Sequence, residues 1–75
     1  MPRRYRPREV ARILTSLGYE LDHHTGSHAN YRKLGYPTVV VPEHRRELPP
    51  GTFASIRRQM VLTNAEFDRI AEEVL

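Results

Sequence analysis

Gly26-Ser27-His28-Ala29-Asn30-Tyr31-Arg32 is the stretch from which the fold of this chain can be read. Its first two residues supply the chemistry of a tight turn. Before the turn, residues 19–24 alternate as Tyr19-Leu21-His23 against Glu20-Asp22-His24, which predicts a half-buried strand. After it, residues 28–34 predict a second strand, so the sequence favours a β-hairpin.

Alternation along the second strand divides its side chains between two faces of a sheet. Ala29 and Tyr31 are predicted to face the core, although Tyr31 on the surface would offer a platform for stacking a nucleobase. The opposite, open face then carries His28, Asn30 and Arg32. Histidine changes charge near neutral pH, so an exposed imidazole beside positive charge can exchange protons with a nucleic-acid backbone. His28 is therefore the candidate proton-transfer group.

A helix is predicted before the hairpin. Pro7 suits a first helical position, and Gly18 suits a C-terminal stop. Between them, apolar residues recur at the i, i+3, i+4, i+7 spacing of one helix face. Arg8 and Arg12 fall off that face, toward solvent or a ligand, and residues 1–6 are predicted to form a loose basic arm. The apolar face consists of Val10, Ile13, Leu14 and Leu17.

A third strand and two helices are predicted after the hairpin. Residues 38–41 are β-branched and are closed by Pro42, and residues 43–51 predict a charged loop. Thr52 is predicted to cap the next helix, and Thr63 with Glu66 predicts the capping box of the last one. The order α-β-β-β-α-α predicts an α+β fold in a single domain, with helices on one face of a three-stranded antiparallel sheet. The apolar faces of the two helices are Phe53, Ile56 and Met60, then Phe67, Ile70, Ala71 and Val74.

Composition narrows the classes of function. A chain of 75 residues buries only about 60% of its extended surface, which leaves no room for a deep cofactor pocket, and no cofactor is predicted. The absence of cysteine excludes disulfides and thiolate metal sites, and it suits a reducing cytoplasm. The longest apolar run is three residues against the ~20 of a membrane span, so no membrane partner is expected.

Charge is unevenly distributed along the chain. Residues 1–58 carry eleven Lys or Arg against five acidic residues, whereas residues 59–75 carry one against four. A basic body suggests a polyanionic partner such as nucleic acid, and the alternative is a solvated surface.

Three blocks of sequence together resemble the HicA toxin family. They are Gly26-Ser27-His28 with Tyr31-Arg32, then Val41-Pro42 with His44, and then Leu48, Gly51-Thr52-Phe53, Ile56, Gln59, Leu62-Thr63 and Phe67. The resemblance implies a fold like a double-stranded RNA-binding domain, ribonuclease activity on messenger RNA in the cytoplasm, and neutralisation by a HicB-type antitoxin. It also implies that the essential histidine of the family is His28.

We hypothesise that His28 promotes RNA cleavage through a cyclic-phosphate product. RNA can cleave itself when a base takes the 2′-hydroxyl proton and an acid protonates the leaving oxygen, and this needs no metal. The sequence leaves open whether His28 is the base or the acid. His44 is either a second proton-transfer group or a loop residue that packs the turn.

Several cations are predicted to bind RNA. Arg32 and Lys33 could hold the scissile phosphate, but alternation lets only one of them share a face with His28, and Arg32 is preferred. Arg45 and Arg46 precede a helix whose N-terminal amides, near residues 51 and 52, form a natural phosphate site. The last pair is Arg57 and Arg58. These two either contact the RNA backbone or simply form the solvent face of their helix.

Other interpretations have less support. His24 and His28 are four residues apart, as zinc ligands on a helix can be, but Gly26 and Ser27 indicate a turn between them. Ser27 as a nucleophile lacks the Gly-x-Ser-x-Gly elbow and an identifiable triad. A non-catalytic RNA-binding module on the same fold is the main alternative, and an interaction protein that uses its acidic last helix is the other.

Overall fold

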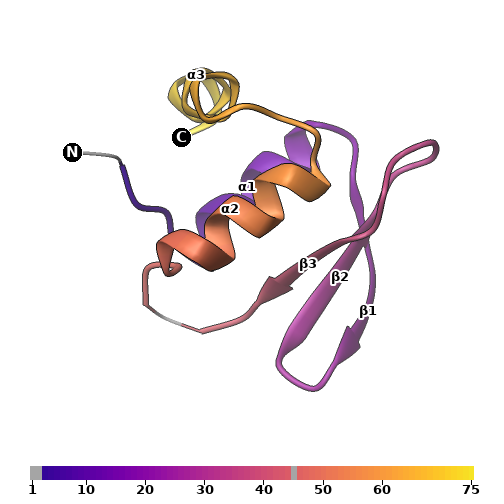
Figure 1. The fold of residues 1–75 in the computed structure, drawn as a ribbon. Helices are drawn as coiled ribbons and strands as arrows, with labels where there is room; N and C mark the ends of the chain where they lie inside the picture. The colour runs from indigo at the N-terminus through magenta and orange to yellow at the C-terminus, as the bar shows by residue number, and fades with distance from the viewer. Residues whose placement is uncertain (1–2, 45) are drawn as a thin grey trace.

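The computed structural model describes residues 3–44 and 46–75. Three strands form one antiparallel sheet in the order β1-β2-β3, and the element order α-β-β-β-α-α confirms the predicted α+β class. The elements are α1 (Pro7–Ser16), β1 (Glu20–Thr25), β2 (His28–Arg32), β3 (Val39–Pro42), α2 (Pro50–Gln59) and α3 (Asn64–Val74) (Figure 1).

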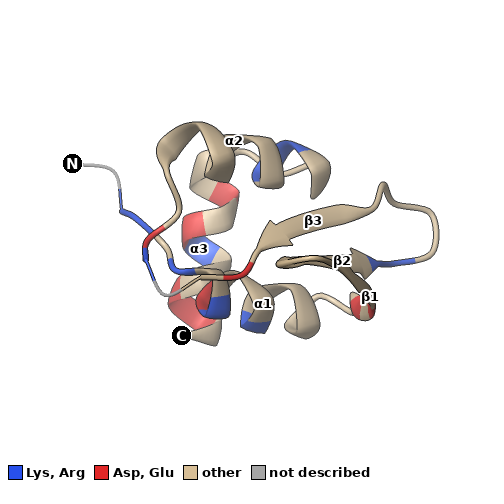
Figure 2. Ribbon diagram, turned by 90° about the horizontal axis from the view of Figure 1, so that it is seen from below, with Lys and Arg blue, Asp and Glu red and all other residues tan. Residues whose placement is uncertain are grey.

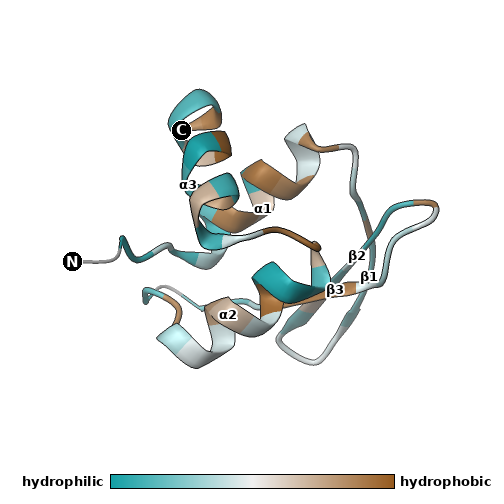
Figure 3. Cartoon of the chain, turned by 45° about the horizontal axis from the view of Figure 1, so that its top comes forward, coloured by the Kyte–Doolittle hydropathy of each residue, from teal (hydrophilic) through white to brown (hydrophobic). Residues whose placement is uncertain are grey.

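The helices lie on one side of the sheet (Figure 1). The predicted face of α1 is confirmed, because Val10, Ile13 and Leu14 are fully buried. Hydrophobic residues recur along α1 and β3, whose buried side chains form the centre of the core (Figure 3). Gly18 ends α1 with a φ of +92°, a left-handed value that glycine adopts without strain.

The first strand differs from its prediction. The sequence predicts a half-buried strand, but every residue of β1 is exposed, and Leu21 keeps 51% of its surface in solvent. The strand order puts β1 at the edge of the sheet, away from β3, against which α1 and α2 pack. The pairing register also shifts between Leu21 and His23, so Asp22 has no partner on β2 and is the extra residue of a β-bulge.

The opposite edge of the sheet is closed by α2. The Gln59 side chain at the end of α2 accepts a hydrogen bond from the Val40 amide at 3.1 Å, which satisfies an outward-facing donor of β3. The sheet is thus covered by α2 along β3 and free along β1.

The N-terminal segment is not the loose arm that the sequence predicts. Tyr5 is fully buried, and its carbonyl accepts a hydrogen bond from the Leu48 amide at 2.8 Å. Tyr5 and Leu48 lie outside the helices and strands, yet both are buried. Hydrophobic periodicity predicts core positions only within regular elements, so it does not reveal these two. Met1 and Pro2 lie outside the described residues.

The two C-terminal helices differ in how they begin. Thr52 is not the cap of α2, because the N-cap is Pro49 and makes no side-chain hydrogen bond. The predicted cap of α3 is confirmed: the Thr63 hydroxyl accepts from the Glu66 amide at 3.2 Å, and the Glu66 carboxylate accepts from the Thr63 amide at 2.9 Å. No helix within residues 3–44 and 46–75 is both long and apolar enough to span a membrane.

Candidate active site

His28 is the first residue of β2, directly after the hairpin turn. Gly26 in that turn has a φ of +59°, so the tight reversal uses the backbone freedom of glycine. The next residue along β2, Ala29, is buried with its partner Val41 on the helix side. Strand alternation therefore directs His28, which is exposed, to the face away from the helices, as predicted.

Tyr31 takes the core position that the sequence favours. It is only 7% exposed, so its ring is not available as a stacking platform for a base. Burial, and to a lesser extent the nearby charge of Glu43, raises the pKa of the Tyr31 phenol above its ordinary value.

Asn30 shares the face of His28 but is nearly buried, at 9% exposure. Its side-chain nitrogen lies 3.4 Å from each of three acceptors on β1 and β2, so Asn30 connects the two strands near the turn. Asn30 therefore stabilises the hairpin and is not exposed enough to bind a ligand on this face. The acceptors are the carbonyls of His23 and His28 and the hydroxyl of Thr25.

Arg32 and Lys33 lie at the far end of β2 from His28. Arg32 is exposed and pairs with Glu20 in the register of the sheet. At about 3.3 Å per residue, four residues separate its backbone from that of His28 by about 13 Å. The Lys33 ammonium lies 4.7 Å from the Tyr36 ring centre and 5.5 Å from that of Tyr19, so it takes part in cation–π contacts there.

His44 lies on the helix side of the hairpin. The Glu43 amide donates to the Ser27 carbonyl at 2.7 Å, which keeps this segment beside the turn. His44 is exposed and borders a cavity of about 140 Å³ whose walls include Ala29, Val41 and residues of α1. His28 is not among the residues that line this cavity.

His24 is also held on the helix side. It pairs with Ala29 in the sheet, and its Nε2 lies 2.8 Å from Oε1 of Glu43. His24 and His28 thus belong to opposite faces and do not form a ligand pair. Within the described part of the chain, no group of three or more His, Cys, Asp or Glu side chains could hold a metal ion.

His23 is a further residue of the open face, and the sequence does not single it out. It is paired with Asn30, which places it on the face of His28, and its Nδ1 lies 2.7 Å from Oδ2 of Asp22. Regular alternation would put His23 on the same face as Leu21, which is the helix side. Because Asp22 is an extra residue, the residues of β1 after it point to the face opposite the one that alternation predicts. No feature of the sequence marks this bulge.

The remaining predicted cations do not gather into one patch. Figure 2 shows Lys and Arg spread over the N-terminal segment, all three helices and the end of β2. Arg57 is partly buried and donates to the Leu62 carbonyl at 3.0 Å, so it also holds the connection after α2. Arg46 and Arg58 are exposed near opposite ends of α2, and Arg45 lies outside the described residues.

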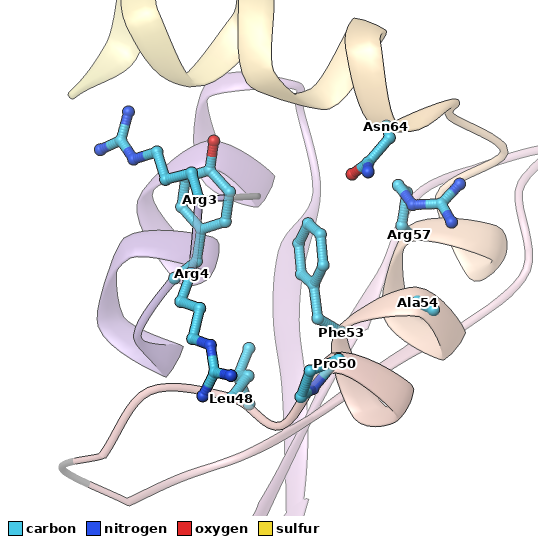
Figure 4. Close-up of a pocket in the computed structure, with 9 residues that line it drawn as sticks. Arg3, Arg4, Leu48, Pro50, Phe53, Ala54, Arg57 and Asn64 are labelled. Carbon is cyan, nitrogen blue, oxygen red and sulfur yellow. The ribbon is translucent and has the colours of Figure 1, made fainter. Parts of the chain in front are cut away.

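A second cavity, of about 220 Å³, lies away from the hairpin (Figure 4). Its lining comes from the N-terminal segment, the connection before α2, α2 itself and the start of α3, and it contains three arginines. The arginines are Arg3, Arg4 and Arg57.

One family model matches the chain over residues 7–62, and it is described as the HicA toxin of bacterial toxin–antitoxin systems. The match runs from the first residue of α1 to the connection after α2, so it includes the whole hairpin and His44. A comparison with curated proteins finds no match.

Proposed function

The chain belongs to the HicA toxin family of bacterial toxin–antitoxin systems, and from this premise we propose that it is an endoribonuclease that cleaves messenger RNA in the cytoplasm. Cleavage needs no metal ion and arrests translation and growth. A HicB-type protein is the antitoxin that neutralises it. His28 is the general base or acid of the reaction.

The observation that carries this proposal is the position of His28. Its imidazole is exposed on the open face of the sheet, and it has no hydrogen-bond partner among residues 3–44 and 46–75. An exposed imidazole of this kind can reach a ligand without displacing a neighbour. No helix of the described residues covers the face around it, so a strand of RNA can approach it (Figure 1).

The chemistry follows from the substrate. A base removes the proton of the 2′-hydroxyl, the 2′-oxygen forms a bond to phosphorus, and the bond from phosphorus to the 5′-oxygen breaks. An acid gives its proton to that leaving oxygen. The products are a 2′,3′-cyclic phosphate and a 5′-hydroxyl, so no oxidant or further reactant is required.

Neutralisation by the antitoxin follows from the same exposure. The simplest way to silence an imidazole on an open sheet face is to cover it. The HicB-type partner is therefore proposed to bury His28 or the approach to it, and its addition to the toxin stops RNA cleavage.

The test is an RNA-cleavage assay on a defined messenger RNA transcript, with and without a metal chelator. The parent is expected to cut in both conditions. His28→Ala removes an exposed side chain, so the free energy of unfolding changes by no more than about 0.5 kcal/mol. Its cleavage rate is expected to fall by roughly 10²–10⁴-fold, the usual contribution of a general acid or base, while RNA and antitoxin binding persist.

His24→Ala is the matched control, because His24 is an exposed histidine of the same hairpin on the helix side. It is expected to cut at the parental rate. A folded His28→Ala variant that cuts like the parent contradicts the assignment to His28. A parent that binds RNA without cutting it is the non-catalytic module, and a parent that chelator inactivates depends on a metal.

A further inference from the structure

A second imidazole lies beside His28 on the open face of the sheet. In the register of the hairpin, His23 is opposite Asn30 and His28 is opposite Thr25. His23 and His28 are therefore diagonal neighbours on adjacent strands. Such neighbours are about 7–8 Å apart, within reach of aromatic side chains.

Only one of the two ring nitrogens of His23 has a hydrogen-bond partner among the described residues. The Asp22 carboxylate accepts a hydrogen bond from Nδ1 at 2.7 Å, and no described residue bonds to Nε2. The side chain is 55% exposed, so Nε2 is open to a ligand. A carboxylate at one nitrogen holds an imidazole in a defined orientation for proton transfer at the other, as in catalytic triads.

The proposed reaction requires two proton-transfer groups. The 2′-oxygen that attacks and the 5′-oxygen that leaves lie on opposite sides of the phosphorus, so one base and one acid must flank a single phosphate. His24 and His44 are the other histidines of the chain, and both belong to the helix side of the hairpin. His23 is the histidine that shares a face with His28.

We infer that His23 and His28 together carry out the two proton transfers of RNA cleavage. One imidazole begins neutral and takes the 2′-hydroxyl proton, and the other begins protonated and gives its proton to the leaving 5′-oxygen. After the step, the imidazole that acted as the base is protonated and the one that acted as the acid is neutral. No external reagent is used. This inference rests on the proposed function and adds a second catalytic residue to it.

The groups that face His23 and His28 come from the three strands of the sheet. β3 faces the pair with two residues that do not titrate, Val40 and Pro42, and no helix within the described part of the chain packs on this side. Asn30, beneath the pair, is also neutral. Among the described residues, the charged or titratable groups beside His23 are Glu20, His28 and Arg32, which share its face, and Asp22, which is hydrogen-bonded to its ring.

The test compares pH–rate profiles of the full chain on one messenger RNA transcript that the parent cuts. A base and an acid that are both essential give a bell-shaped profile with two limbs. In His23→Gln, we expect one limb to disappear and the rate at the parental optimum to fall by roughly 10²–10⁴-fold. A structural role would lower the rate without removing a limb.

The adjacent histidine supplies the control. His24→Gln removes an imidazole of similar exposure, 47% against 55%, from the same strand and the opposite face, and it is expected to keep both limbs. The melting temperatures of both variants are expected to lie close to that of the parent, because each side chain is about half exposed and each has one carboxylate partner.

A modified substrate separates the acid from the base. When sulfur replaces the leaving 5′-oxygen, the leaving group needs no proton. Cleavage is then expected to recover in only one of His23→Gln and His28→Ala, namely the one that lacks the acid.

Two outcomes overturn the inference while the proposed function stands. If His28→Ala is inactive but His23→Gln keeps the rate and both limbs of the parent, His23 has no part in catalysis and the proposed function stands. If the sulfur substrate restores neither variant although the parent cuts it, the two imidazoles do not share the reaction. A parent that cuts no RNA contradicts the proposed function itself, and this inference with it.

Discussion

Tyr5 joins parts of the molecule that are far apart in the sequence. Its hydroxyl donates to Asp68, 63 residues away, at 2.7 Å. Its ring centre lies 5.3 Å from that of Phe53 in α2 and 4.9 Å from that of Phe67 in α3. One side chain from the N-terminal segment therefore holds the two C-terminal helices in the same aromatic cluster.

Tyr5→Phe tests this contact while preserving the ring. Loss of a hydrogen bond to a charged group is expected to lower the free energy of unfolding by roughly 1.5–3 kcal/mol, measured by denaturant titration near neutral pH. Burial first, and then the hydrogen bond to Asp68, raises the pKa of Tyr5 from 10.0 to about 12.

Because folding raises the pKa of Tyr5, the stability that Tyr5 contributes decreases at high pH. A pKa raised by folding contributes stability below the unfolded value of 10.0, and this stability is lost as the pH rises toward about 12. The difference in stability between the parent and Tyr5→Phe is therefore expected to shrink across this range. A difference that stays constant to pH 12 contradicts the assignment.

At the scale of elements, α2 and α3 show two ways to begin a helix. α2 begins at Pro50 after Pro49, and proline at a first helical position removes an amide that would have no partner. α3 begins with a reciprocal capping box between Thr63 and Glu66. The hydrogen bonds from Thr63, first from its backbone, lower the pKa of the Glu66 carboxyl below its ordinary value.

Two threonines provide a matched pair of variants. Thr63→Ala removes the cap of α3 and is expected to cost about 1 kcal/mol of stability, measured by thermal or denaturant unfolding. Thr52→Ala is expected to cost less, because Thr52 lies inside α2, where no side-chain cap is made and alanine is the better helix former. Equal losses in the two variants would mean that the Thr63 cap adds nothing of its own.

At the scale of the whole molecule, the layers separate charge. α3 carries all four acidic residues of the segment 59–75, and α1 and α2 lie between it and the sheet (Figure 1). The open face that bears His28 is thus on the side of the molecule away from the acidic helix. This arrangement lets a polyanion reach the sheet without facing α3.

RNA binding is accordingly expected to weaken steeply with salt. The log–log slope for a single strand is roughly −0.7 per phosphate neutralised, so replacing both Arg45 and Arg46 by Ala should make the slope shallower by about one to two units. Arg69→Ala in α3 is the control and is expected to leave the slope unchanged. Fluorescence titration over a range of salt concentrations measures both, and a parental slope near zero would exclude the basic residues from RNA binding.

The sequence by itself determined the features that depend on near neighbours. The 3.6-residue period of α1, the burial of Ala29 and Tyr31, the turn at Gly26 and the capping box at Thr63 each follow from residues a few positions apart. The three-block pattern likewise identified the family, because it uses only order and spacing.

Only the tertiary structure decided which face each β1 histidine occupies. Alternation counted from Leu21 puts His24 on the side opposite Leu21, but pairing with β2 makes Asp22 an extra residue, so His23 and His24 exchange sides. The burial of Tyr5 and the exposure of β1 have the same origin. Both depend on which distant segments pack against them, and contacts between distant segments leave no local period in the sequence.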